Sequence, residues 1–236
     1  MNNGIDELLG RHTPTAARPL LGLTLLLVED SRFASEAFRL MCLRSGARIR
    51  RADSLRSARR HLANYRPSVV IVDMGLPDGS GAELIRELAN GRSVEVLLAT
   101  SGDDDALETA IAAGADGCLS KPVLSLGSFQ EEILSHLPPE ARPRGPREIS
   151  DEVLVPDEIA LKDDLTHVAE LMQDEDPAPR LAYVAQFVEA LANGARDNGL
   201  AEAARALRQE DIEANAAACA RLRALIEDRI SRCKAM

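Results

Sequence analysis

Two runs of apolar residues, each ending in carboxylates, constrain the fold of this chain most. Leu23–Val28 (LTLLLV) is followed at once by Glu29 and Asp30, and the second run, VVIVD, ends in Asp73. Continuous apolar runs of this length are typical of strands that are covered on both faces of a parallel sheet. Because such strands need helices on both sides, the sequence favours an α/β domain.

The segments around these two runs extend the pattern to five strands and five helices. Strands are predicted at residues 23–28, 48–52, 69–73, 94–99 and 116–119, of which 48–52 (RIRRA) is the weakest because arginines replace apolar residues. Helices are predicted at residues 32–45, 55–65, 81–90, 103–113 and 126–137. This (βα)5 order predicts a doubly wound parallel sheet, whose ligands bind outside the carboxyl ends of the strands.

A proline-rich segment divides the chain. Residues 138–146 (PPEARPRGP) hold four prolines and one glycine, which excludes the interior of a helix or strand. We predict an N-terminal tail at 1–20, the α/β domain at 21–137, a Pro-rich linker at 138–150 and a smaller all-α helical bundle at 151–236. In the bundle, helices are predicted at 157–172, 178–193, 200–209 and 211–233, with a turn at Asn198-Gly199.

Polar residues follow the predicted strands and are expected to converge. Glu29 and Asp30 follow the first strand, Asp73 ends the third, Thr100 follows the fourth and Lys121 the fifth. Three carboxylates at one edge of a sheet repel one another, and a hard divalent cation such as Mg2+ relieves that repulsion. A lysine and a hydroxyl at the same edge can bind the oxygens of a phosphoryl group.

In their order and spacing, these features resemble the receiver domain of bacterial two-component response regulators. The acidic pair in LLLVED, the aspartate in VVIVDMGLPDGSG, the hydroxyl in LLATSGDD and the stretch GADGCLSKP carry the resemblance, which covers residues 23–137. It implies a receiver/flavodoxin-like fold in which Asp73 accepts the phosphoryl group. Asp30 and Asp73 would bind Mg2+ directly, Glu29 would act on the ion through water, and the backbone carbonyl of Gly75 would complete the ligands.

The resemblance also assigns residues to the phosphoryl group. Thr100 would bond it, Lys121 would pair with it, and the Lys121-Pro122 peptide bond is expected to be cis. Ser101 rivals Thr100 for the hydroxyl role, because the region after this strand is one residue shorter than the common pattern. Cys118 stands where the family usually places an aromatic residue, so the usual aromatic reorientation is not expected here.

The partner implied by the resemblance is a cognate histidine kinase or a phosphotransfer protein. From residue 147 to the end there are 11 Lys and Arg against 19 Asp and Glu, which gives −8 of the net charge of −10. This balance disfavours contact with nucleic acid. The C-terminal part contains neither a GxSxG motif nor a phosphate-binding loop, so no separate enzymatic output is predicted.

A protein-interaction or dimerisation role for the helical bundle is therefore favoured, with a homodimer among its candidate assemblies. The alternative is a transcription regulator with a helical DNA-binding output domain; salt-dependent retention on non-specific DNA distinguishes the two.

The apolar run at residues 20–28 is too short to cross a bilayer and has no features of a secretion signal. The four cysteines are scattered without a metal-ligand or CxxC spacing, which is typical of reduced thiols. We therefore expect a soluble, cytoplasmic protein without a membrane partner.

Overall fold

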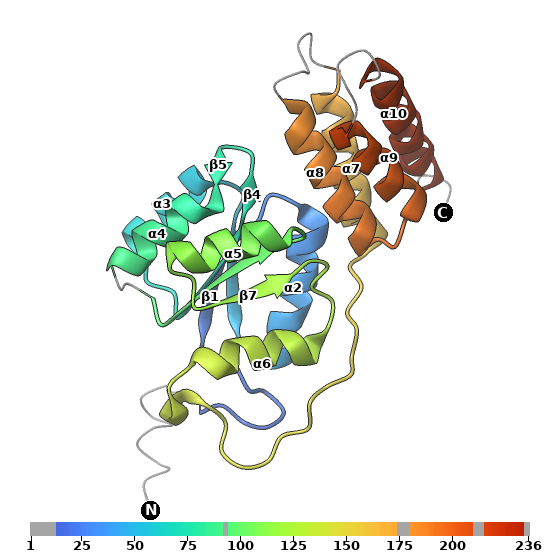
Figure 1. Ribbon diagram of the computed structural model, residues 1–236. Coiled ribbons are helices and arrows are strands. Elements are labelled where there is room, and N and C mark those ends of the chain that lie inside the picture. The colour runs from blue at the N-terminus through green and yellow to red at the C-terminus, as the bar shows by residue number, and fades with distance from the viewer. Residues whose placement is uncertain (1–12, 92–93, 174–179, 210–214, 234–236) are drawn as a thin grey trace, which may run out of the picture. The chain divides into compact units, whose positions relative to one another are not determined.

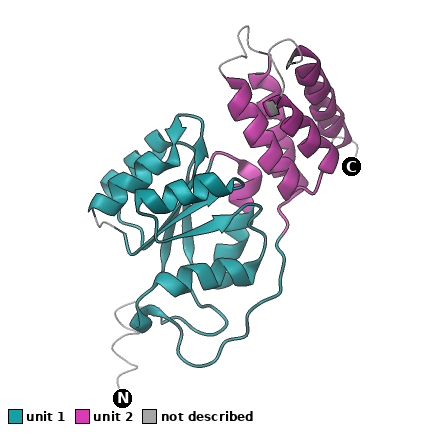
Figure 2. Cartoon of the chain, in the orientation of Figure 1, with its two compact units in different colours: residues 1–29, 37–154 teal, residues 30–36, 155–236 magenta. Residues whose placement is uncertain are grey.

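The computed structural model describes residues 13–91, 94–173, 180–209 and 215–233 (Figure 1). Contacts between residues divide the chain into two compact units (Figure 2). Unit 1 comprises Met1–Glu29 and Ala37–Leu154, and unit 2 comprises Asp30–Glu36 and Val155–Met236. Unit 2 therefore combines a short stretch from the N-terminal half with the C-terminal region.

Unit 1 contains a five-stranded sheet whose strands are all parallel. In order across the sheet they are β2 (Arg48–Ala52), β1 (Thr24–Val28), β3 (Val69–Asp73), β6 (Val96–Ser101) and β7 (Gly117–Ser120). The predicted doubly wound α/β fold is confirmed. Since the chain passes from β1 to β2 and returns to β3 on the other side, the strand order reverses between β1 and β3, where sheets of this kind bind ligands.

Helices cover both faces of the sheet (Figure 1). On one face lie α2 (Arg32–Ser45) and α6 (Leu126–His136), and on the other α3 (Leu55–Asn64), α4 (Gly81–Gly91) and α5 (Asp104–Ala113). Strand residues alternate between the two cores: Leu25 packs with Phe38 and Phe129, whereas Leu26 packs with Ile85. Covering both faces explains why the central strands are continuous apolar runs.

Strand β2, the weakest of the predicted strands, lies at an edge of the sheet and pairs with β1 alone. Arg48 and Arg50 are exposed and only Ala52 is buried. The guanidinium carbon of Arg50 lies 4.8 Å from the centroid of the Tyr65 ring, within the range of a cation–π interaction. The arginines are therefore compatible with a strand because this strand is half exposed.

The last two strands begin later than predicted. Strand β6 runs from Val96 to Ser101 and not over 94–99, because its pairing with β3 starts at Val69↔Val96. Strand β7 begins at Gly117, because its pairing with β6 starts at Leu98↔Gly117; the preceding Asp116 carboxylate accepts a hydrogen bond from the Leu97 N–H at 2.7 Å. Thr100 and Ser101 consequently both lie within β6.

The chain after α6 stays in unit 1 as far as Leu154. A single 3-10 turn, η1 (Pro139–Ala141), lies within the proline-rich stretch. Further on, Leu154 is buried in the core beneath α6, and Val153 forms an isolated antiparallel bridge with Ser125. The boundaries proposed for the linker stay a prediction.

Four helices form the described C-terminal part of unit 2: α7 (Glu158–Leu171), α8 (Leu181–Gly194), α9 (Asn198–Gln209) and α10 (Asn215–Arg232). Apolar residues at helical spacing on α7 and α8, including Leu165, Val168, Val184 and Val188, are buried in one shared core. The predicted helical region is thereby confirmed, although residues 178–179 and 211–214 of the predicted helices lie outside the described ranges. None of the helices described is long and apolar enough to span a membrane.

The predicted turn at Asn198-Gly199 is wrong, because these two residues begin α9. Asp197 caps this helix: its Oδ1 accepts a hydrogen bond from the Leu200 N–H at 3.1 Å. The chain turns just before, at Arg196, whose φ is 57°. The preference of an Asn-Gly pair for a turn is overridden here because the aspartate directly before the pair caps a helix that starts at the asparagine.

We predict that Gly114→Ala destabilises unit 1 more than Gly145→Ala. Both glycines have positive φ, 109° and 87°, but a Cβ on Gly114 would lie 2.6 Å from the Ala89 Cβ, whereas one on Gly145 meets nothing within 4 Å. The backbone term costs roughly 1–2 kcal/mol at either site, and the clash adds about 1–3 kcal/mol at Gly114. Urea unfolding of both variants measures the difference in the free energy of unfolding. Equal losses of stability would contradict the close approach of Gly114, which follows α5, to Ala89 on α4.

Candidate functional site

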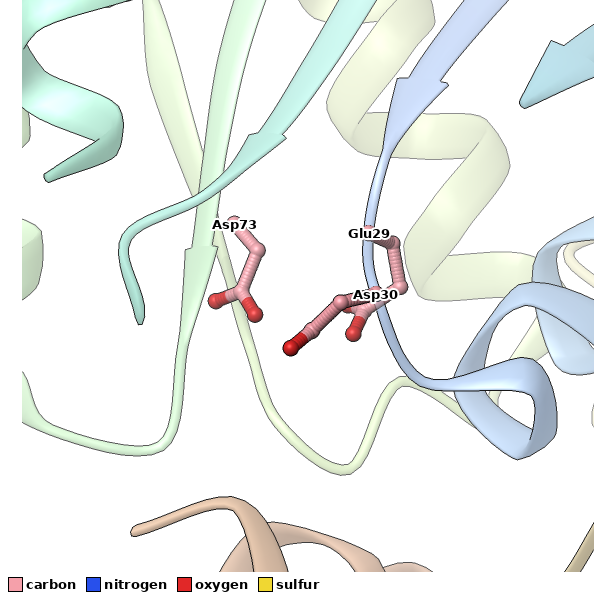
Figure 3. Close-up of side chains that lie close together, drawn as sticks. All are labelled: Glu29, Asp30 and Asp73. Carbon is pink, nitrogen blue, oxygen red and sulfur yellow. The ribbon is translucent and has the colours of Figure 1, made fainter. Parts of the chain in front are cut away.

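The sheet brings three carboxylates together at the carboxyl ends of two adjacent inner strands, β1 and β3. Glu29 and Asp30 follow β1, and Asp73 is the last residue of β3 (Figure 3). One oxygen from each lies within 4.8 Å of the others. Glu29 is 1% exposed and Asp73 5% exposed, so their negative charges are largely removed from water.

Lys121, directly after β7, supplies positive charge to this acidic cluster of Glu29, Asp30 and Asp73. Its Nζ lies 2.8 Å from Glu29 Oε2 and 2.9 Å from Asp73 Oδ2, and its side chain is 11% exposed. Burial alone would lower the pKa of Lys121, but the two carboxylates outweigh it and raise the pKa above its ordinary value. The Lys121-Pro122 peptide bond is cis, as predicted.

The two candidate hydroxyls differ in their surroundings. Thr100 pairs with Asp73 in the register of β3 and β6, and consecutive strand residues point to opposite faces. The Thr100 Oγ1 donates to the Leu119 carbonyl at 2.8 Å, whereas the Ser101 Oγ accepts from the Asp103 N–H at 3.1 Å. The register therefore puts Thr100, and not Ser101, on the face to which Asp73 points.

A tight hairpin follows Asp73. It consists of β4 (Gly75–Leu76) and β5 (Gly79–Ser80), and the Gly75 N–H donates to Asp73 Oδ1 at 3.2 Å. A Cβ on Gly81 would lie only 2.2 Å from the Asp73 carbonyl oxygen, so this position requires glycine. The hairpin thereby keeps the backbone of Gly75 beside the carboxylate of Asp73.

Sequence reasoning missed Asp78, which lies in this hairpin. Its two carboxylate oxygens accept hydrogen bonds from the Leu55 N–H at 2.9 Å and the Arg56 N–H at 3.0 Å. Asp78 therefore ties the loop after the third strand to the start of α3. Its place in LPDGSG indicated a turn, and nothing in the spacing connected it with a helix more than twenty residues earlier.

The acidic cluster fits a hard divalent cation. When ionised, the three carboxylates carry three negative charges, of which Lys121 neutralises one. Buried uncompensated charge is costly, and a dication would balance the remaining two charges. Carboxylate oxygens are the ligands that Mg2+ prefers, so Glu29, Asp30 and Asp73 are the residues that could hold it.

We predict that Lys121→Met destabilises the chain by about 3–5 kcal/mol near pH 7.5, because it leaves buried carboxylates without their counter-charge. The loss should be smaller near pH 5, because protonation of a carboxylate relieves the repulsion. Since the pKa of Lys121 is raised, the ammonium of the parent is fully charged at both pH values.

Denaturant unfolding at both pH values tests this prediction. Lys162→Met is the matched control, since it removes the same charge from a partly exposed position on α7. A loss independent of pH, or one equal to that of the control, would contradict it.

The N-terminal half of the chain has relatives among known proteins. Residues 25–133 match the response regulator receiver domain family. The KDP operon transcriptional regulatory protein KdpE of Escherichia coli (strain K12) is 36% identical over 110 residues, which make up 46% of this chain and 48% of KdpE. The virulence transcriptional regulatory protein PhoP of Salmonella typhimurium (strain 14028s / SGSC 2262) is 33% identical over 103 residues, 42% of this chain and 46% of PhoP.

Among solved structures, a response regulator from Thermotoga maritima matches with 22% identity and a TM-score of 0.45, over 50% of this chain and 98% of that one. The chain spans about half the length of the curated relatives it matches.

Proposed function

We propose that the chain is a two-component response regulator that accepts a phosphoryl group on Asp73, because residues 25–133 match the response regulator receiver domain family. One observation carries the proposal. Asp73 ends β3 beside Glu29 and Asp30, is in ion-pair contact with Lys121, and is in register with Thr100. A receiver that had lost phosphorylation would not need all of these residues, and all are present.

In the proposed reaction, an oxygen of Asp73 attacks the phosphorus of a phosphohistidine. A P–O bond forms, the P–N bond breaks, and the histidine nitrogen leaves with the bonding electrons. Asp30, Asp73 and the Gly75 carbonyl would hold Mg2+ directly, with Glu29 acting through water. When bound, the ion supplies positive charge that offsets the negative charge of the phosphoryl oxygens.

Lys121 and Thr100 would bind the phosphoryl group on Asp73. The Lys121 ammonium already contacts Asp73, so it can follow the new negative charge over a short distance. The Thr100 hydroxyl would turn from the Leu119 carbonyl to a phosphoryl oxygen. Phosphorylation would therefore replace a hydrogen bond and an ion-pair contact at the ends of β6 and β7. A local change of charge of this kind shifts the equilibrium between two conformations of a protein.

The phosphodonor partner is a sensor histidine kinase or a phosphotransfer protein. For unit 2 we propose a protein-interaction or dimerisation output, because the chain from residue 147 onward carries 19 acidic against 11 basic residues. A DNA-binding output would need a basic surface. KdpE and PhoP are named as transcriptional regulatory proteins, but the matches cover only 48% and 46% of their lengths.

We predict that acetyl phosphate with MgCl2 adds one phosphoryl group to the parent protein and none to Asp73→Asn, as read by intact-protein mass spectrometry. Asp104→Asn is the matched control, because this aspartate is exposed in the first turn of α5, and it should be labelled like the parent. Labelling that survives in Asp73→Asn, or is absent from the parent, would contradict the proposed phosphoacceptor.

The output is tested by size-exclusion chromatography with light scattering. With MgCl2 and beryllofluoride, which mimics a phosphoryl group on an aspartate, we expect the parent to change in mass or elution volume and Asp73→Ala to stay unchanged. A doubled mass would identify dimerisation. Retention of either protein on non-specific DNA, weakening as salt rises, would instead favour the DNA-binding alternative.

A further inference from the structure

Residues Asp30–Glu36 belong to unit 2, together with the C-terminal helices. Phe33, in the first turn of α2, is 5% exposed and lies in the same core as Leu165 and Val168 of α7. A Cβ on Gly194, at the end of α8, would lie 3.1 Å from the Phe33 ring, so the glycine leaves room for it. The segment directly after β1 is therefore packed into the helical core.

Asp164 on α7 holds the start of α2. It is 3% exposed; its Oδ1 accepts from the Arg32 N–H at 2.9 Å, and its Oδ2 accepts from the Phe33 N–H at 3.0 Å and the Ser31 hydroxyl at 2.7 Å. The first N–H groups of a helix have no partner within the helix, and a carboxylate there is also favoured by the helix dipole. Asp164 thus acts as a cap supplied from a helix more than a hundred residues away in sequence.

Tyr183 on α8 holds Asp30, the first residue of the segment Asp30–Glu36. Its hydroxyl donates to Asp30 Oδ2, while the Ser31 N–H donates to Asp30 Oδ1 at 3.1 Å. The Tyr183 ring is fixed against Phe187, with centroids 5.8 Å apart. Each oxygen of the Asp30 carboxylate therefore accepts a hydrogen bond from a donor that unit 2 positions.

On the basis of the proposed function, we propose that Tyr183 and Asp164 are positioning residues for Asp30, so that Mg2+ binding at the acidic cluster depends on helices α7 and α8. Donors that bond a ligand carboxylate orient it, and their loss typically weakens metal binding about 10–100-fold. Coupling of this kind is reciprocal: if the contact with Tyr183 favours the cation, the cation must favour the contact. The C-terminal helices would then sense the occupancy of the site directly through Asp30.

Calorimetric titration of the full chain with MgCl2 tests the role of Tyr183. We expect Tyr183→Phe, which keeps the ring and removes the hydroxyl, to bind Mg2+ about tenfold more weakly than the parent. Tyr65→Phe is the matched control, because among the described residues the Tyr65 hydroxyl has no hydrogen-bond partner, and its affinity should be unchanged. Equal or tighter binding by Tyr183→Phe would overturn the proposal.

A second pair of variants tests Asp164. Asp164→Asn loses the charge that caps α2 and should also weaken Mg2+ binding. Asp163→Asn removes the same charge one residue earlier, where the carboxylate forms an exposed ion pair with Arg32 at 2.7 Å, and should bind like the parent. If Asp164→Asn does not fold, Tyr183→Phe alone decides; if it folds and binds like Asp163→Asn, Asp164 has no positioning role.

Hydrogen–deuterium exchange separates positioning from a merely structural role. By reciprocity, MgCl2 should slow exchange in Asp30–Glu36 and in the first turns of α8 in the parent, whereas in Tyr183→Phe the effect on α8 should disappear. A structural role alone would change exchange equally with and without the ion. Such equal change would count against the proposal.

Failure of this inference is distinguishable from failure of the proposed function. Binding of Mg2+ by the parent, its loss in Asp73→Asn and an unchanged affinity in Tyr183→Phe would leave the proposed function standing and overturn the inference. Absence of binding in the parent and in every variant would overturn both.

Discussion

Charge burial at the ends of β1 and β3 is the constraint on which the rest of the site depends. Two nearly inaccessible carboxylates, Glu29 and Asp73, lie at the ends of adjacent strands, and the Lys121 ammonium contacts both. The ammonium offsets only part of the negative charge, and the surplus makes the site receptive to a dication. Gly81 avoids a clash with the Asp73 carbonyl, the hairpin keeps the Gly75 backbone beside the Asp73 carboxylate, and the register places Thr100 next to Asp73.

Much of the first unit could be predicted because its signals are local. Apolar runs closed by carboxylates mark strands buried on both faces, and their ends are by topology the place where ligands bind. The errors were local as well. Strand β6 begins at Val96 because register with β3 decides the boundary, and Asn198 begins a helix because Asp197 caps it. Neither effect can be read from propensity alone.

Contacts between distant parts of the chain could not be predicted. In the sequence, Asp78 is an ordinary turn residue, and Asp164 and Tyr183 are residues of predicted helices. Nothing in the spacing marks them, because their hydrogen-bond partners are set by the packing of distant segments. The side-chain oxygens of Asp164 meet backbone donors at the start of α2 only after the helices have formed. That Glu29, Asp30, Asp73 and Lys121 lie close together was predictable from the sequence, whereas the groups that hold Asp30 in place required the structure.

The edge strand β2 has a consequence for the behaviour of the protein at high concentration. An exposed strand edge offers unpaired backbone groups to other chains, and charged side chains on such a strand discourage that pairing. Arg48 and Arg50 are exposed on β2, and the opposite edge strand, β7, has only four residues. The arginines that weakened the strand prediction therefore protect the sheet from edge-to-edge aggregation.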